Sequence, residues 1–161
     1  MAAAGVSITA RVEGDEVLGA AFARLLRLGR DPRALLDEVG GAMVASTEQR
    51  FVTEEDPEGN PWPALDPDYA RRRRGGAAHI LRRDLHLFDS LSHRVGTGEV
   101  AWGVNRVYAR IHQFGGEAGR GGAAEIPARP YLGVSAEDRR EIERIVLDHV
   151  DGAVGPGSAA R

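Results

Sequence analysis

The sequence contains no cysteine and no lysine among its 161 residues. The absence of cysteine excludes disulfides, thiolate metal sites and a cysteine nucleophile. Every cationic side chain other than histidine is therefore arginine. A GC-rich genome explains this bias, and the alternative is a need for planar, forked hydrogen bonding at interfaces. Aromatic residues are sparse at 6%, but a hydrophobic content of 42% suits a soluble globular protein.

Long apolar runs and an excess of positive charge are missing as well. No stretch approaches the length of a membrane span and the N-terminus lacks a signal-peptide pattern, so we expect no membrane partner. The net charge of -3 argues against a generally basic nucleic-acid-binding protein. We expect a single domain over residues 1–151 and a disordered, glycine- and alanine-rich tail over residues 152–161.

The N-terminal third of the chain predicts one strand and two helices. Residues 6–12 alternate apolar and polar side chains, which is typical of a strand with one buried face. Apolar residues at three- and four-residue spacing predict helices over residues 15–28 and 31–53. Gly40 and Gly41 lie inside the second helix and cost about 1 kcal/mol each relative to alanine. Either another element packs closely there or the helix bends.

The segment from residue 53 to residue 68 is expected to be a loop, because its four prolines exclude regular structure. Trp62 lies in its middle and either clamps the loop onto the core, which we favour, or anchors a partner protein. A short basic helix is expected over residues 69–74 and another helix over residues 78–91.

The remaining pattern predicts strands and one long helix. Strands over residues 92–95 and 99–105 are separated by a short glycine loop suited to a hairpin. Ser135 and Asp138 resemble a capping box that begins a C-terminal helix. The fold class is therefore α+β, with a mainly antiparallel sheet packed with three to four helices.

Residues 107–114 also alternate and predict a third strand beside the hairpin. We expect Ile111 and Phe114 to be buried against the helices. Paired glycines end this strand and a flexible glycine-rich loop is expected up to residue 124. The following segment, residues 126–133, is stiffened by two prolines.

Several ordered motifs support a family resemblance. They are Arg50-Phe51, Asp56-Pro57-Glu58-Gly59-Asn60-Pro61-Trp62, His112-Gln113-Phe114-Gly115-Gly116 and Ile126-Pro127-Ala128-Arg129-Pro130-Tyr131-Leu132-Gly133. Together they resemble the phage virion morphogenesis family of tail completion proteins, known from Mu-like and P2-like phages. The resemblance covers residues 33–150. The sequence departs from the family pattern at Leu85, where a small residue or glycine is usual, and this departure favours a continuous helical turn over the local turn that the resemblance implies.

The resemblance implies a structural virion protein of a tailed phage that completes the tail and joins it to the head. Such a protein is expected to form a sixfold neck ring with itself. Neighbouring connector and tail tube proteins would be partners, and DNA would pass through the channel. The implied location is the virion, and the host cytoplasm during assembly, with no cofactor and no enzymatic activity.

The residues themselves also offer no convincing catalytic or metal site. Ser135 lacks the second glycine of a nucleophile elbow and suits an N-cap better. The glycine-rich loop has no following Lys-Ser/Thr and is not a phosphate loop. His112 is expected to be a hydrogen-bonded sheet histidine. A further alternative is a cell-wall hydrolase carried in the virion, and this function requires activity that survives in the monomer.

The charge layout suggests a subunit interface. Six acidic residues lie within residues 54–68 with no basic residue among them, and six arginines lie within residues 71–83 with no acid. Either these are two solvated faces, or they pair between subunits and set the register of a ring. Candidate interface residues are Glu54, Glu55, Asp56, Glu58, Trp62, Arg71, Arg72, Arg73, Arg74, His112, Phe114, Arg129 and Tyr131. The alternative function is a nucleic-acid-binding module that uses the arginines of residues 71–83.

Overall fold

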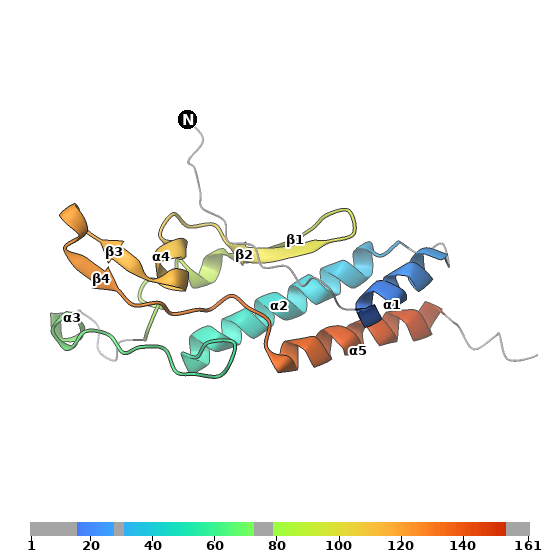
Figure 1. Ribbon diagram of the computed structural model, residues 1–161, viewed down its shortest axis with the longest axis horizontal. Coiled ribbons are helices and arrows are strands. Elements are labelled where there is room, and N and C mark those ends of the chain that lie inside the picture. Colours follow the sequence, from blue (N-terminus) through green and yellow to red (C-terminus); the bar gives the residue numbers. More distant parts are fainter. Residues whose placement is uncertain (1–15, 28–30, 73–78, 154–161) are drawn as a thin grey trace, which may run out of the picture.

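The computed structural model describes residues 16–27, 31–72 and 79–153 (Figure 1). The strand predicted over residues 6–12, most of the predicted tail, and Arg73 and Arg74 lie outside the described residues. The helices are α1 (Glu16–Arg27), α2 (Arg33–Thr53), α3 (Pro67–Arg72), α4 (Ala109–Phe114) and α5 (Ala136–Ala153), with short 3-10 turns η1 (Phe88–Ser90) and η2 (Arg120–Gly122). The strands are β1 (Leu91–Val95), β2 (Val100–Val104), β3 (Gly116–Ala118) and β4 (Ala124–Ile126).

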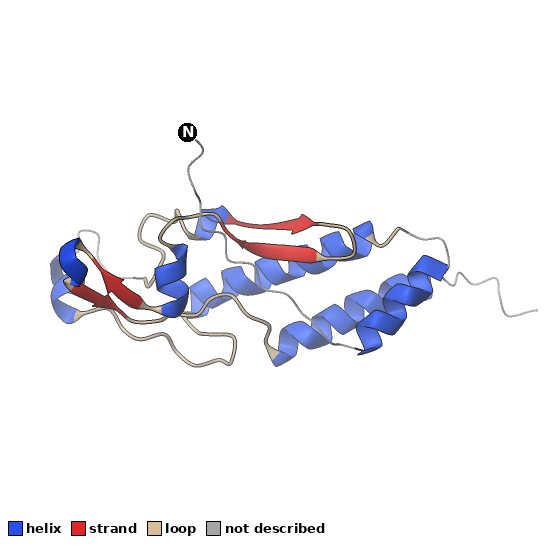
Figure 2. Ribbon diagram, turned by 45° about the horizontal axis from the view of Figure 1, so that its top comes forward, coloured by secondary structure: helices blue, strands red, loops and turns tan. Residues whose placement is uncertain are grey.

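Helix α2 is the central element. The β1–β2 hairpin lies along one side of it, α5 lies along another, and α1 packs beside α5 (Figure 1). Figure 2 shows the second hairpin, β3–β4, at one end of the molecule, apart from β1–β2. Both hairpins are antiparallel. The α+β class is confirmed, but the strands form two small sheets where one sheet was expected.

The paired glycines of α2 mark a close contact with β1 and β2. A Cβ atom added to Gly40 would lie 2.4 Å from the His93 ring and 2.9 Å from a Val100 methyl group. A Cβ atom on Gly41 would meet nothing within 4 Å. Of the two alternatives for these glycines, close packing is therefore confirmed at Gly40. Pro32 is the N-cap residue of α2, and the Asp31 carboxylate before it accepts a hydrogen bond from the Arg33 backbone N–H at 2.9 Å.

The core forms between α2, α5, the first hairpin and the segment that precedes α5. Its largest fully buried side chains include Tyr131 and Phe51, whose ring centroids are 5.2 Å apart. Trp62 packs edge-on against Phe51 at 5.5 Å, so the expected clamp of the proline-rich loop onto the core is confirmed. The capping box is confirmed by reciprocal hydrogen bonds, Ser135 N–H to Asp138 Oδ2 at 2.7 Å and Asp138 N–H to Ser135 Oγ at 3.0 Å.

The strand predicted over residues 107–114 is wrong, because residues 109–114 form helix α4. Ala109 and Gln113 are the buried residues of this helix, and their spacing of four matches one helical face. Ala109 and Gln113 would also face the same side of a strand, so the alternating pattern alone did not distinguish a strand from a helix. Phe114 is 59% exposed and Ile111 is half-buried, so the predicted burial of Phe114 is wrong as well.

The helix predicted over residues 78–91 is also wrong for the described residues 79–91, in which the only helical element is the short turn η1. Leu81 and Leu85 adopt left-handed backbone conformations, with φ of 58° and 57°, and these interrupt any helix. The local turn of the family pattern is therefore present at Leu85, and the expected continuous helical turn is wrong. Tertiary contacts hold the segment on either side, because Ile80 and Leu87 are buried and the Glu54 carboxylate accepts a hydrogen bond from the Ile80 N–H at 2.8 Å.

The glycine-rich passage after α4 forms a hairpin, where an irregular loop was expected. Strands β3 and β4 pair from Gly116↔Ile126 to Ala118↔Ala124. Gly115 turns the chain into β3 with a φ of 72°, and a Cβ atom there would lie 2.8 Å from the Ala128 nitrogen. A glycine is therefore required at this position both for its conformation and for space. The expected mobility of this passage remains a prediction.

Candidate functional site

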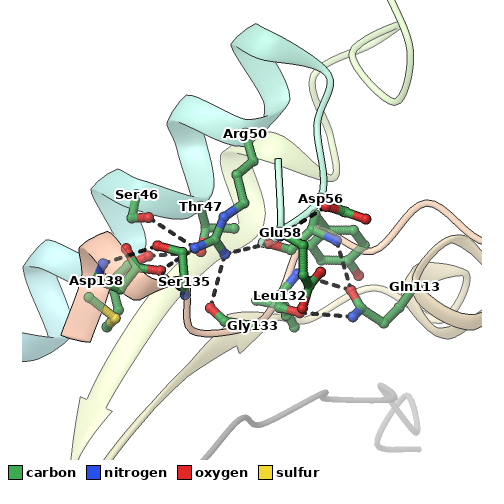
Figure 3. Close-up of polar contacts among 12 residues, drawn as sticks. Ser46, Thr47, Arg50, Asp56, Glu58, Gln113, Leu132, Gly133, Ser135 and Asp138 are labelled. Atoms are coloured by element: carbon green, nitrogen blue, oxygen red, sulfur yellow. Dashed lines mark hydrogen bonds and ion pairs between the residues drawn. The ribbon is translucent and has the colours of Figure 1, made fainter. Parts of the chain in front are cut away.

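The motif residues around Tyr131 are enclosed by a buried polar network (Figure 3). Arg50, on α2, donates from Nη1 to the carbonyl oxygens of Tyr131 and Gly133, each at 3.0 Å. Its Nη2 donates to the hydroxyl of Ser46 at 3.1 Å and forms an ion pair with the carboxylate of Asp138. The side chains of Arg50 and Asp138 are only 8% and 5% exposed. The network therefore joins α2 to α5 through the intervening chain.

Asp138 has two functions, since it caps α5 and also neutralises Arg50. Burial by itself would raise the pKa of Asp138, but hydrogen bonds with Ser46 and Ser135 and the charge of Arg50 outweigh it and lower this pKa. The carboxylate is consequently charged at neutral pH. A buried arginine whose charge is not neutralised would be costly, so the pair acts as a unit.

Gln113 holds the same segment from the side of α4 (Figure 3). Its Oε1 accepts hydrogen bonds from the backbone N–H groups of Tyr131 and Leu132, each at 3.0 Å. Its Nε2 donates to the carbonyl oxygen of Leu132 at 2.9 Å. One amide side chain thus satisfies three buried backbone groups, much as a neighbouring strand would.

The proline-rich loop contacts the other end of this segment. Trp62 donates from its indole N–H to the carbonyl oxygen of Pro130 at 2.8 Å. Arg129 donates to the carbonyl oxygens of Pro63 and Ala64 at 2.8 and 3.0 Å. The motif residues therefore fix the path of the chain from residue 129 to residue 133.

A groove opens on the other side of Arg129 and has a volume of about 670 Å³. We call it the β4 groove because β4 forms one wall. Its lining includes Leu65, Leu81, Leu87 and Ile126, and its rim carries the exposed side chains of Tyr69, Leu85 and Tyr108. The combination of an apolar interior and exposed large side chains is typical of a site for another protein or ligand.

His112 lines the β4 groove from α4, not from a sheet as was expected. Its Nδ1 is buried without a hydrogen-bond partner, and its ring lies edge-on to that of Tyr108 at 5.9 Å. Burial and the nearby charge of Arg129 lower the pKa of His112, so the ring is neutral at pH 7. Among the described residues, no group of three or more histidine or acidic side chains is arranged to hold a metal ion.

The candidate interface residues have different environments. Trp62, Arg129 and Tyr131 are buried within the subunit. Glu54, Asp56 and Arg71 are engaged locally, Glu54 with Ile80, Asp56 with the backbone of the following turn, and Arg71 with Asp68. Glu58, Arg72 and Phe114 are exposed, while Glu55 and His112 are half-buried. Arg73 and Arg74 lie outside the described residues.

The role of Arg50 in the site was not predicted, although a signal for it exists. Arg50 precedes Phe51 and follows Thr47 by three residues, and both neighbours belong to the buried stripe of α2. An arginine on a buried helical face needs an acid and carbonyl partners. The sequence does not say which of the many acids supplies the charge. Only the fold brings Asp138, 88 residues further along, within reach.

The fold and the site define a class of small α+β protein in which the motif side chains bind the protein's own backbone and a groove faces outward. The phage virion morphogenesis family matches residues 14–151, and the chain belongs to this family. The predicted resemblance is thus confirmed, and the protein has a role in phage virion morphogenesis.

Three relatives illustrate the match. The chain is 29% identical to Mu-like prophage FluMu G protein 2 of Haemophilus influenzae, covering 88% of this chain and 95% of the relative. It is 30% identical to the putative capsid assembly protein G of Escherichia phage Mu, covering 76% and 81%. It is also 30% identical to the tail completion protein S of Escherichia phage P2, covering 74% and 84%. No solved structure gives a significant match. In the described part of the chain, every helix is too short or too polar to cross a membrane.

Proposed function

We propose that this protein is a structural component that completes the phage tail and joins it to the head, as one subunit of a sixfold neck ring. The observation that carries this proposal is that the motif side chains bind the protein's own backbone, whereas exposed apolar side chains gather on one surface. The side chains of Arg50, Gln113 and Trp62 form hydrogen bonds with the backbone around Tyr131. Exposed aromatic and leucine side chains lie at the β4 groove. Such a subunit offers a rigid body with a surface for protein contacts.

The relatives support the same function. One of them is a tail completion protein and another a putative capsid assembly protein. For this chain, the proposed partners are further copies of itself, the connector of the head and the tail tube. The proposed location is the neck of the virion, after assembly in the host cytoplasm. The proposal assigns no enzymatic activity to the protein.

The test is removal of the gene from the phage, followed by electron microscopy of the lysate. We expect separate heads and tails, with joining restored by the wild-type protein supplied from a plasmid. Native mass spectrometry of the purified protein should show a hexamer. Normal tailed particles without the protein would refute its role in joining, and a stable monomer at every concentration would refute the ring.

In the proposed ring, the acidic residues within residues 54–68 and the arginines within residues 71–83 can pair between subunits. We propose that Arg71–Arg74 of one subunit lie near the acidic loop of the next. Within the subunit Glu54 is already engaged by Ile80, so Glu55 and Glu58 are the better partners. Changing Arg72 and Arg73 to glutamate should weaken assembly, most strongly at low salt where repulsion is least screened. Recovery on changing Glu55 and Glu58 to arginine would support the pairing.

The nucleic-acid-binding alternative uses the same arginines. Two of them already have acidic neighbours, since Arg71 pairs with Asp68 and Arg83 lies 3.5 Å from Asp84. This reduces the positive field available for phosphates. Retention on a DNA column is the discriminating measurement. Retention that falls steeply with salt would favour the alternative, while flow-through at low salt would exclude it.

A further inference from the structure

We propose that the β4 groove receives residues 6–12 of a neighbouring copy of the chain, added as a third strand beside β4. This inference rests on the proposed ring and names one of its contacts. Four observations carry it: the free edge of β4, the apolar groove beside that edge, the sequence of residues 6–12, and the distance of the groove from α1.

The first observation is the isolation of the β3–β4 hairpin. Among the described residues, β4 pairs with β3 alone. Strand β4 borders the groove and β3 does not. A two-stranded hairpin is marginally stable by itself, and an unpaired edge presents backbone groups to which another strand can bind. Strand addition at such an edge is a common mode of peptide recognition.

The second observation is the apolar character of the β4 groove. Tyr69, Leu85 and Tyr108 lie at its rim with 47%, 46% and 39% of their surfaces exposed. Leu65, Leu81 and Ile126 are half-buried and line its interior. Alternate apolar side chains from an extended segment would cover these groups and leave the segment's backbone free to pair with β4.

The third observation is the sequence of residues 6–12, which lie outside the described part of the chain. They place Val6, Ile8, Ala10 and Val12 on one side and Ser7, Thr9 and Arg11 on the other. No acidic residue occurs before Glu13. The segment therefore has one apolar side for the groove and a polar side that carries a positive charge.

The charge of the segment matches the hairpin. Glu117 and Glu125 are cross-strand partners, and both are exposed. Like charges directly opposite each other are unfavourable in a sheet. A third strand beside β4 that places Arg11 on the face of Glu125 would relieve this repulsion. The apolar side of the segment would then share the face of Ile126.

The fourth observation concerns which copy supplies the segment. Helix α1 packs beside α5 toward one end of the molecule, whereas the β3–β4 hairpin and α3 lie at the opposite end (Figure 1). A helix of the length of α2 spans about 31 Å. The four residue steps from Glu16 back to Val12 reach at most about 14 Å. We therefore assign the donated segment to a neighbouring copy.

Engineered cysteines provide a direct test, because the natural chain has none. One full-length protein would carry Arg11→Cys and another Glu125→Cys, and the two would be mixed under native conditions and oxidised. We expect a disulfide-linked mixed dimer on a non-reducing gel. Arg11→Cys mixed with Glu143→Cys, which is exposed on α5, is the matched control and should give no such dimer.

Charge reversal provides a second readout in the full-length protein. Arg11→Glu or Glu125→Arg alone should shift the assembly toward monomer in native mass spectrometry, and the combination should restore the oligomer. Ser7→Cys and Thr9→Cys, each mixed with Glu125→Cys, test whether the donated strand pairs with β4 in a different register. If the oligomer forms but no pair cross-links, the inference is overturned while the ring stands.

Two further outcomes are also decisive. A disulfide that forms only when both cysteines are in the same chain would show that the subunit fills its own groove, which overturns the exchange between copies. A wild-type protein that stays monomeric would refute the ring itself, and with it the donor. The two proposals therefore fail in different measurements.

Discussion

Replacement of Arg50 by methionine is the most informative test of the buried network. The change keeps much of the side chain's length but removes its charge and donors. The carbonyl oxygens of Tyr131 and Gly133 lose their arginine donor, and the Asp138 carboxylate stays buried without its cation. Removing one member of a buried ion pair typically costs about 3–5 kcal/mol.

The assays are urea and thermal unfolding of the purified variant, followed by circular dichroism and compared with wild type at pH 7. For a chain of this size each kcal/mol corresponds to about 2–4 °C in the melting temperature, so a fall of about 10 °C is expected. Arg139→Met is the matched control, because Arg139 is exposed on α5, and it should change the free energy of unfolding by less than about 0.5 kcal/mol.

The pH dependence gives an independent check with a defined sign. The folded-state pKa of Asp138 is lowered, so the stability from its charge is present above the unfolded value of about 3.9. That stability is lost as the pH falls through the folded pKa. The difference between wild type and Arg50→Met should therefore shrink below about pH 4. A loss under about 1 kcal/mol at pH 7, or a difference independent of pH, would refute the assigned role of the pair.

Three further predictions concern packing and mobility. Gly40→Ala should destabilise by about 1–3 kcal/mol because its Cβ would clash with His93, whereas Gly41→Ala should stabilise by roughly 0.5–1 kcal/mol; chemical denaturation compares them, and equal effects would contradict the packing. Gln113→Met should cost about 2–4 kcal/mol in the same assay by leaving three buried backbone groups unpaired, and a neutral result would contradict this. In hydrogen exchange, residues 115–124 should exchange quickly in the monomer and slowly in the assembled protein, and strong protection in the monomer would disprove the mobility.

Local sequence patterns predicted the structure correctly where the residues near a segment in sequence also determine its environment. The helix over residues 33–53, the hairpin of β1 and β2, and the capping box at Ser135 were predicted from spacing, turn residues and capping chemistry. The clamp by Trp62 followed from its position among prolines. The helix, the hairpin and the capping box depend on interactions that span only a few residues, whereas the partner of the Trp62 indole, Pro130, is 68 residues away.

The predictions failed where distant contacts override local preference. Residues 109–114 alternate in polarity, but the amide of Gln113 binds the backbone near Tyr131, and that contact fixes a helix. At Leu85 the sequence favours a helical turn, yet Ile80 and Leu87 are held in the core on either side and the turn between them becomes left-handed. No pattern within either segment contains this information.

The sequence by itself determined the family, the α+β class and the separation of charge along the chain, because these depend on the order and type of residues alone. Only the tertiary structure decided which polar residues are buried together. Arg50 and Asp138 are far apart in sequence, and their pairing follows from the packing of α2 against α5. The β4 groove likewise exists only because a proline-rich loop, a short helix and a hairpin meet at one end of the molecule.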